Sequence, residues 1–248
     1  MESIALITGA SRGIGAASAR LLAAQGLTVC VNYRQQQTRA TALVAQLQSA
    51  GHTAFAVQAD VSEEAGVRTL FRTVDARAGR LTVLVNNAAM LSQQMRVDQM
   101  TATRINRMLT TNVTSAFLCC REAVLRMSSK HGGHGGAIVN VSSAAARLGS
   151  AGEYVDYAAS KGAIDTLTRG LALEVADEGI RVNCVRPGFI YTDMHADGGE
   201  PGRVDRVAPQ IPMRRGGTAE EVAAAIAWLA SEQASYATGA FIDLAGGR

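Results

Sequence analysis

The sequence has no segment that would hold the protein in a membrane or mark it for export. No apolar run approaches the roughly 20 residues that a membrane-spanning helix needs. The first residues, MESIALITGASRG, lack the basic segment and the long apolar core of a secretory signal. We therefore expect a cytoplasmic protein with no membrane partner.

Clusters of basic residues are also missing. The net charge is only +3, and the sequence contains neither a lysine-rich arm nor a basic block with interleaved aromatic residues. These are the features by which a nucleic-acid-binding surface is usually recognised. We therefore expect no nucleic-acid partner.

Cysteine and histidine are scarce and are not spaced as metal ligands. No two cysteines form a CxxC pair, and all lie in apolar runs, which is typical of reduced thiols in a protein core. His131-Gly-Gly-His134 resembles a metal-binding tract in composition, but no cysteine or carboxylate lies near it, which favours a flexible surface turn. The sequence therefore predicts no metal site. The four cysteines are Cys30, Cys119, Cys120 and Cys184.

Lysine is almost missing as well. Of the 24 basic residues only Lys130 and Lys161 are lysines. Lys161 lies four residues after Tyr157, so a helix would place the ammonium and the phenol on one face. A tyrosine titrates near pH ~10, and a neighbouring cation is expected to lower the pKa of the phenol towards neutrality. With a hydroxyl from Ser142 or Ser143, such a pair could transfer a proton at an alcohol or carbonyl oxygen.

Apolar runs of strand length alternate with helical patterns along the chain, which predicts an α/β protein. At 25.9 kDa the chain could form one large domain or two small ones. No internal repeat or linker divides it, so we predict a single domain over residues 1–248. The expected strands cover 3–8, 27–32, 53–59, 81–85, 137–142, 180–185 and 240–244. The expected helices cover the stretch from Gly15 to Gln25 and residues 38–50, 63–78, 103–129, 154–178 and 218–231.

A glycine-rich loop connects the first expected strand to the first expected helix. It reads Gly9-Ala-Ser-Arg-Gly13-Ile-Gly15. Glycines let the backbone turn tightly and approach a pyrophosphate, which the N-terminus of the following helix attracts. The spacing differs from the general G-x-G-x-x-G pattern, but the strand before it and the helix after it favour a dinucleotide site.

Residues 3–59 contain no acidic residue. A domain of this kind that prefers NAD usually has an Asp or Glu near the end of the second strand to bind the ribose 2′-hydroxyl. Here Arg12 lies in the glycine loop and Arg34 follows the second strand, and a guanidinium binds phosphate well. We therefore predict NADP(H) in preference to NAD(H), although the two arginines could also be solvated surface residues.

Polar residues follow several of the expected strands, at the edge where ligands of parallel sheets bind. Asp60 could accept a hydrogen bond from the adenine amino group, or Asp60 or Ser62 could cap the next helix. Asn86 and Asn87 could tie neighbouring loops together and line a cofactor site. All four prolines lie within 187–212, which predicts a lid over the substrate at about 189–216.

Taken together, these motifs closely resemble the short-chain dehydrogenase/reductase family, and the resemblance covers nearly the whole chain. The most similar branch contains the 3-oxoacyl-acyl-carrier-protein reductases and the glucose dehydrogenases. The motifs are Thr8-Gly9-Ala-Ser-Arg-Gly13-Ile-Gly15, Asp60-Val61, Asn86-Asn87-Ala88, Asn112, Ser143, Tyr157, Lys161, Pro187-Gly188 … Thr192 and Gly239 … Gly246-Gly247.

The resemblance implies a Rossmann-type, doubly wound sheet of seven parallel strands with helices on both faces, assembled as a homotetramer or a dimer. It implies that Tyr157 is the general acid/base, that Lys161 lowers its pKa and binds the nicotinamide ribose, and that Ser143 orients the substrate oxygen. Asn112 would hold a relay water beside Lys161. The expected cofactor contacts are Gly9, Ser11, Arg12, Gly13, Ile14, Gly15, Arg34, Asp60, Val61, Asn87, Ala88, Tyr157, Lys161, Pro187, Gly188, Ile190 and Thr192.

Two departures from the family pattern concern the substrate. The family's Asn-Asn-Ala-Gly ends at Ala89 here, and we expect the added methyl group to be tolerated at the pocket edge. Ser143 lies 14 residues before Tyr157, about one more than in the acyl reductases, which weakens the case for an acyl-carrier substrate. Glu153 could bind a substrate hydroxyl or be an ordinary carboxylate near a helix start.

The sequence therefore predicts an NADP(H)-dependent oxidoreductase that interconverts a small carbonyl compound and its alcohol, with reduction as the expected direction. The substrate is not identified by the residues that would read it, which lie in 90–96, 144–155 and the expected lid. One alternative is a sugar or polyol dehydrogenase that uses NAD(P). Another is a regulator that senses the dinucleotide without catalysis, but the chain retains all four catalytic residues of the family.

Overall fold

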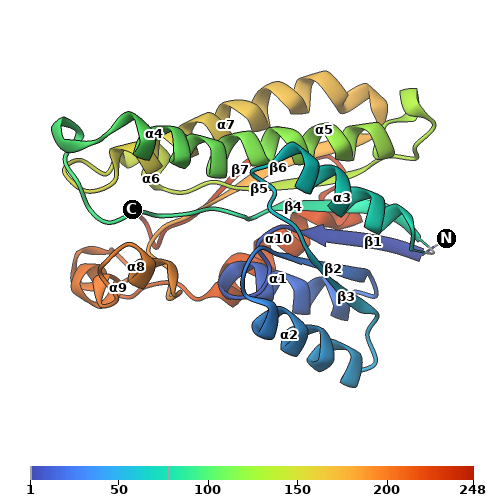
Figure 1. The fold of residues 1–248 in the computed structure, drawn as a ribbon, viewed down its shortest axis with the longest axis horizontal. Coiled ribbons are helices and arrows are strands. Elements are labelled where there is room, and N and C mark those ends of the chain that lie inside the picture. Colours follow the sequence, from blue (N-terminus) through green and yellow to red (C-terminus); the bar gives the residue numbers. More distant parts are fainter. Residues whose placement is uncertain (1, 78) are drawn as a thin grey trace.

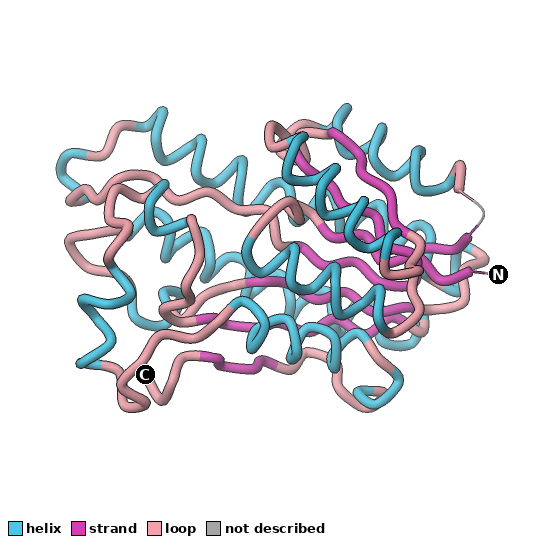
Figure 2. The backbone as a smooth tube through the Cα atoms, turned by 90° about the horizontal axis from the view of Figure 1, so that it is seen from below, coloured by secondary structure: helices cyan, strands magenta, loops and turns pink. Residues whose placement is uncertain are grey.

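The structure is a computed structural model, and it describes residues 2–77 and 79–248. Each of the expected apolar runs forms a strand, with ends within two residues of the predicted ones. All seven strands pair in parallel in one sheet. Figure 2 shows the strands side by side with helices around them. The strands are β1 (Glu2–Ile7), β2 (Thr28–Tyr33), β3 (Ala54–Gln58), β4 (Gly79–Asn86), β5 (Gly136–Val141), β6 (Ile180–Pro187) and β7 (Phe241–Leu244).

Helices cover both faces of the sheet, which confirms the predicted fold class (Figure 1). One face is covered by α1 (Gly13–Ala24), α2 (Gln37–Ser49) and α10 (Ala219–Ala230). The other is covered by α3 (Glu64–Asp75), α5 (Ser115–Met127) and α7 (Val155–Val175). These helices are rich in alanine and branched aliphatic residues on the side that meets the sheet, so each buries an apolar stripe.

The order of the strands places the functional site. The sheet runs β3-β2-β1-β4-β5-β6-β7, so the chain reverses direction across the sheet between β1 and β4. At such a reversal, the loops after the two strands leave towards opposite faces and open a crevice at the carboxyl ends of the strands. Both the glycine loop after β1 and the Asn86-Asn87 pair at the end of β4 lie at this crevice.

Two expected helices differ from their predictions. The helix expected over 103–129 consists of α4 (Ala102–Leu109), a π-helical segment (Thr110–Thr114) and α5, because the hydrogen-bond pattern widens by one residue near Asn112. The helix expected over 63–78 is α3 and ends at Asp75, and residue 78 lies outside the described residues.

The 189–216 segment, which the sequence predicts as a lid, folds into short helical turns. They include α8 (Met194–Asp197) and α9 (Arg203–Val207). A further short helix, α6 (Ala145–Leu148), lies between β5 and α7. Gly149 caps its C-terminal end with a φ of +77°. Both pieces lie at the end of the molecule that holds the crevice (Figure 1).

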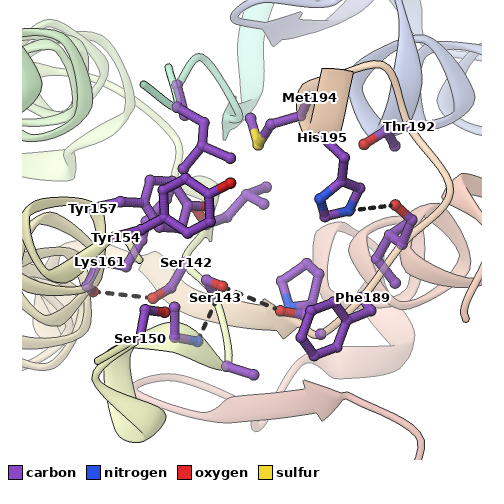
Figure 3. Close-up of a pocket in the computed structure, with 18 of the residues that line it drawn as sticks. Ser142, Ser143, Ser150, Tyr154, Tyr157, Lys161, Phe189, Thr192, Met194 and His195 are labelled. Carbon is purple, nitrogen blue, oxygen red and sulfur yellow. Dashed lines mark hydrogen bonds between the residues drawn. The ribbon is translucent and has the colours of Figure 1, made fainter. Parts of the chain in front are cut away.

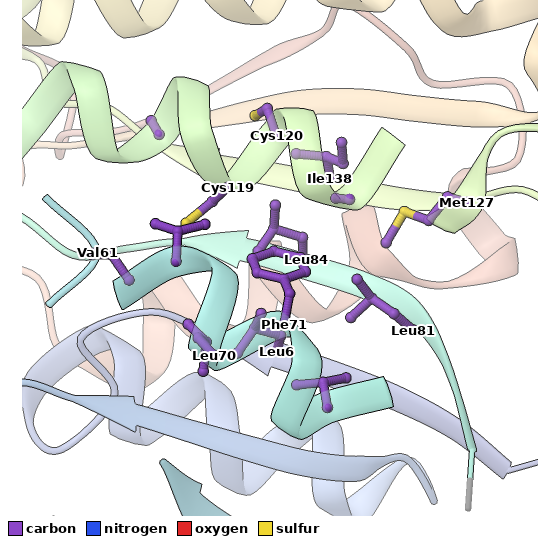
Figure 4. Packing of buried hydrophobic residues seen from close by; sticks show 14 of the residues in the cluster. Leu6, Val61, Leu70, Phe71, Leu81, Leu84, Cys119, Cys120, Met127 and Ile138 are labelled. Carbon is purple, nitrogen blue, oxygen red and sulfur yellow. The ribbon is translucent and has the colours of Figure 1, made fainter. Parts of the chain in front are cut away.

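The core on the α3, α5 and α7 face is built from large side chains that interlock between sheet and helices (Figure 4). Phe71 of α3 is fully buried against this layer, near Leu84 of β4 and Leu6 of β1. Cys119 and Cys120 of α5 belong to the same layer, and all four cysteines of the chain are buried and unbonded to one another, as expected. Among the described residues, no helix is both long and apolar enough to cross a membrane.

We expect Phe71→Ala to lower the free energy of unfolding by about 3–5 kcal/mol, because it removes a fully buried ring and leaves a cavity. Denaturant-induced unfolding measures this change. Leu173→Ala is the matched control, because Leu173 is 80% exposed and its loss should change stability by less than about 0.5 kcal/mol. Equal effects of the two substitutions would contradict the packing described here.

Candidate functional site

The glycine loop has a geometry that side chains other than glycine would disturb. Gly9 and Gly13 adopt φ angles of +61° and +55°, in the left-handed region that glycine enters without strain. A Cβ atom at Gly15 would lie 2.6 Å from the Asn87 amide nitrogen and 2.8 Å from the Ala10 Cα. The loop therefore packs directly against the segment that follows β4.

The N-terminus of α1 fits a phosphate group. Arg12 occupies the N-cap position, no side chain caps the helix, and its first turn contains no acidic residue. The backbone N–H groups and the positive end of the helix dipole are thus available to an anion. The residues present therefore fit the pyrophosphate of a dinucleotide.

Hydrogen bonds from Asn87 hold the two sides of the crevice together. Its side-chain amide donates to the carbonyl oxygens of Thr8 and Gly9 at 2.9 and 3.1 Å. The Thr8 hydroxyl in turn accepts from the backbone N–H groups of Asn87 and Ala88, both at 3.0 Å. Asn87 therefore ties neighbouring loops together as expected, whereas the Asn86 amide donates to the buried Asn140 Oδ1 atom at 2.9 Å. Contact of this pair with a cofactor stays a prediction.

Three of the four predicted catalytic side chains converge on a cleft with a cavity volume of about 130 Å³ (Figure 3). Ser143 follows β5, and its hydroxyl donates to the Pro187 carbonyl at 3.4 Å. Tyr157 and Lys161 project from α7 towards the same cleft, with the Lys161 Nζ atom 5.6 Å from the centre of the Tyr157 ring. Nine predicted site residues line the cleft: Ile14, Asn87, Ser143, Tyr157, Lys161, Pro187, Gly188, Ile190 and Thr192.

The electrostatics of Tyr157 differ from the prediction. Burial raises the pKa of Tyr157 to about 12, and only a hydrogen bond with Ser143 opposes this effect. Lys161 is not among the groups that shift the pKa of the phenol, and its ammonium donates to the Val141 carbonyl at 2.8 Å. Burial also lowers the pKa of Lys161 to about 8, although the charges of Cys184 and Asp165 act in the opposite direction. The predicted lowering of the Tyr157 pKa by Lys161 is therefore wrong for the contacts described.

Asn112 lies in the π-helical segment and is almost completely buried. Its Oδ1 atom accepts from the Met90 N–H at 2.8 Å, and its amide nitrogen donates to the Met90 carbonyl and the Ser160 hydroxyl, each at 3.1 Å. The side chain thus connects the loop after β4 to α7, and no hydrogen bond joins it to Lys161. Its role with a relay water stays a prediction.

The arginines on the cofactor side pair with carboxylates. Arg12 forms ion pairs with Asp193 and Asp197 of the 189–216 segment, and Arg39 pairs with Asp193 at 2.5 Å. Arg34 lies 3.6 Å from Asp60. Arg39 and the two aspartates were not among the predicted contacts, because they lie more than 150 residues apart in the sequence.

Asp60 turns back onto the loop that follows β3. Its Oδ1 atom accepts from the backbone N–H and the hydroxyl of Ser62, at 2.9 and 2.6 Å. Partial burial favours a higher pKa, but these hydrogen bonds and the charge of Arg34 outweigh it and hold the pKa of Asp60 below its usual value. The N-cap of α3 is Glu63, so the alternative in which Asp60 or Ser62 caps this helix is wrong. The contact with adenine stays a prediction.

A second group of ion pairs fastens the 189–216 segment to the loop before α7. The buried guanidinium of Arg203 pairs with Glu153 and Glu200, and Arg206 pairs with the same two carboxylates. Glu153 is therefore engaged by arginines, which favours its interpretation as a structural carboxylate near a helix start. Thr192 lies close to the glycine loop, because a Cβ atom at Gly13 would be 3.4 Å from its methyl group.

The remaining predicted cofactor residues surround the crevice without lining the cleft. They are Gly9, Ser11, Arg12, Gly13, Gly15, Arg34, Asp60, Val61 and Ala88. Ala89, which departs from the family pattern, borders the cleft as expected.

Comparisons with known proteins agree with this geometry. The family model described as Enoyl-(Acyl carrier protein) reductase matches residues 9–248. An Escherichia coli (strain K12) protein named Uncharacterized oxidoreductase YgfF is 65% identical over 246 residues, which cover 99% of this chain and 100% of that protein. The 3-oxoacyl-[acyl-carrier-protein] reductase FabG of Staphylococcus aureus (strain Mu50) is 36% identical over 247 residues, covering 100% of this chain and 98% of that protein. A solved short-chain dehydrogenase/reductase from Serratia marcescens BCRC 10948 is similar with a TM-score of 0.90 and 33% identity, covering 99% of this chain and 97% of that one.

The buried ammonium of Lys161 predicts a pH dependence of stability. Its pKa is about 8 in the folded protein against 10.5 for the ordinary group, so the unfolded chain binds more protons between these values. We therefore compare the free energy of unfolding of the wild type with that of Lys161→Met. The difference, wild type minus variant, should rise as the pH increases from about 8 to about 10.5.

Chemical denaturation at several pH values measures this difference. Lys130→Met is the matched control, because an exposed ion pair with Glu178 raises the pKa of Lys130, so its contribution should stay nearly constant up to about pH 10.5 and fall only above that pH. A difference for Lys161 that stays constant between about pH 8 and 10.5 would contradict the burial of its ammonium.

Proposed function

The chain belongs to the short-chain dehydrogenase/reductase family, and we propose that it is an NADP(H)-dependent enzyme that reduces a small carbonyl compound, with Tyr157 as the general acid/base. Membership implies oxidoreductase activity with a nicotinamide cofactor. The observation that supports the proposal most strongly is the convergence of Ser143, Tyr157 and Lys161 on one cleft next to the glycine loop.

In this proposal the protein supplies a proton at the substrate oxygen. The phenol of Tyr157 is protonated at neutral pH, as an ordinary tyrosine is, so it holds the proton that a carbonyl oxygen would accept. Burial raises its pKa to about 12, which makes the phenol a weaker acid until substrate and cofactor change its surroundings. The Ser143 hydroxyl faces the phenol and orients that oxygen. The nicotinamide, when bound, supplies the hydride. In the reverse reaction, alcohol oxidation, the phenolate would accept the proton.

The preference for NADP(H) rests on Arg12, Arg34 and Arg39. These three guanidinium groups surround the glycine loop and the end of β2, where no carboxylate is contributed by residues 3–59. Each is paired with a carboxylate, so a 2′-phosphate would replace one set of charge partners with another. Asp193 therefore competes with the phosphate for Arg12 and Arg39.

We further propose that the 189–216 segment acts as a lid within a single domain spanning residues 1–248. Its ion pairs reach the glycine loop on one side, through Asp193 and Asp197, and the loop before α7 on the other, through Arg203. Assembly as a homotetramer and location in the cytoplasm stay predictions from the sequence.

Replacing Tyr157 with Phe tests the mechanism. We expect turnover of any accepted carbonyl substrate to fall by at least about a hundredfold, because no other group can donate the proton at that position. NADPH affinity and the thermal midpoint should remain close to those of the wild type. Tyr236→Phe is the control, because Tyr236 is fully exposed and lies outside the cleft. Retained turnover in Tyr157→Phe would refute the assigned role.

Titration with NADPH and NADH, followed by fluorescence, tests the cofactor assignment. The wild type should bind NADPH more tightly, and Arg12→Ala or Arg34→Ala should each weaken NADPH binding about tenfold while changing NADH binding little. Asp193→Asn should strengthen NADPH binding, because the phosphate then meets less competition. Arg20→Ala is the control, since Arg20 bonds to Gln46 on the outer surface of α1 and α2. Equal or tighter binding of NADH by the wild type would refute the assignment.

A further inference from the structure

His195 of α8 lies in the wall of the cleft and has a defined tautomer (Figure 3). Its ring stacks on Phe189, with ring centres 6.5 Å apart and an interplanar angle of 20°. Its Nε2 atom lies 3.1 Å from the Ile190 carbonyl oxygen. A carbonyl oxygen can only accept, so Nε2 must carry the hydrogen, and in the neutral ring Nδ1 is then an acceptor.

The surroundings keep this ring neutral. Burial is the main effect that lowers the pKa of His195, and the nearby positive charge of Arg203 acts in the same direction. The carbonyl of Ile190 and the charge of Glu200 oppose these effects without reversing them. The Nδ1 lone pair is therefore present at neutral pH.

No described residue donates a hydrogen bond to Nδ1, although the atom is shielded from solvent. A buried acceptor without a donor costs folding free energy, and most such atoms in native proteins have a partner. Because His195 belongs to the 189–216 segment proposed as a lid, movement of that segment would uncover Nδ1, and a ligand in the cleft can then supply the donor.

Two large polar side chains near His195 already have partners. Arg203 is held by Glu153 and Glu200, and the Tyr154 hydroxyl donates to the Gly198 carbonyl at 3.1 Å. Apolar residues such as Leu91, Leu148 and Met194 form much of the remaining surface. A substrate therefore meets a largely apolar surface in which Nδ1 is an unused acceptor.

We propose that His195 Nδ1 accepts a hydrogen bond from a hydroxyl group of the substrate, so that the enzyme selects small hydroxyketones over ketones of the same shape without a hydroxyl. This inference rests on the proposed carbonyl reduction, in which Tyr157 and Ser143 bind the reacting oxygen. The second oxygen of the substrate must be a donor. An ether, a carboxylate or a phosphate at that position lacks the hydrogen that Nδ1 requires.

Steady-state kinetics with NADPH and matched ketones test the proposal. 1-Hydroxy-2-butanone has a hydroxyl where 3-pentanone has a methyl group, on the carbon next to the carbonyl carbon. 4-Hydroxy-2-butanone and 2-pentanone give the same comparison with the hydroxyl one carbon further from the carbonyl. The methyl ethers of the two hydroxyketones can accept but not donate. For at least one pair we expect the hydroxyketone to have a kcat/KM about five- to tenfold higher than its methyl analogue, with no such advantage for the ether.

Two substitutions of His195 separate recognition from a structural role. His195→Gln places an amide nitrogen near the position of Nε2, which preserves the bond to Ile190, but leaves no acceptor near Nδ1. His195→Asn places its amide near Nδ1, which preserves an acceptor there, but loses the bond to Ile190. The ratio of hydroxyketone to methyl-ketone kcat/KM should fall to about one in the Gln variant, through loss of the single hydrogen bond, and should persist in the Asn variant.

The outcomes distinguish this inference from the function on which it rests. Reduction of hydroxyketones and methyl ketones with equal kcat/KM would overturn the role of His195 and leave the proposed reductase activity intact. A hydroxyl preference that survives in His195→Gln, or that the ethers share, would also overturn it. Failure to reduce any of these ketones, together with an absence of NADPH binding, would overturn the proposed function and this inference with it.

Discussion

The attachment of Asn87 to the glycine loop is the constraint on which the rest of the site depends. β1 and β4 are neighbours in the sheet although β2 and β3 separate them in the sequence, so their loops must be joined by side chains. Asn87 makes this connection through the carbonyl groups of Thr8 and Gly9. A Cβ atom at Gly15 would lie only 2.6 Å from this amide, so close packing explains the glycine at this position.

Charge then organises the part of the protein that the sheet does not hold. The 189–216 segment is connected to the body by two sets of ion pairs, one to arginines of the glycine loop and α2 and one to Glu153 before α7. The Arg12 and Arg39 pairs are about half exposed, so each contributes little to stability and can exchange partners readily. The pairs of Arg203 are more buried and should hold more firmly. The two sides of the segment thus differ in how easily they release.

The sequence was sufficient to predict the fold and to single out the candidate catalytic side chains that meet at the cleft, because both depend on local patterns. Apolar runs marked each strand, and the spacing of Tyr157 and Lys161 placed them on one helical face. What it could not show depends on distant contacts. The pairing of Arg39 with Asp193 joins residues 154 positions apart. The π-helical segment around Asn112 has no clear pattern, because one widened turn hardly changes the helical period.

The pKa of Tyr157 shows most clearly why spacing alone was insufficient. A cation one helical turn away lowers the pKa of a phenol only when its attraction for the phenolate exceeds the cost of burying the charge. In this site both side chains are buried, and burial is the largest effect on the pKa of each, so it raises that of Tyr157 and lowers that of Lys161. A neutral phenol held beside Ser143 is a proton donor. The same burial that opposes the simple electrostatic prediction therefore keeps the proton on Tyr157 until a substrate oxygen is present to accept it.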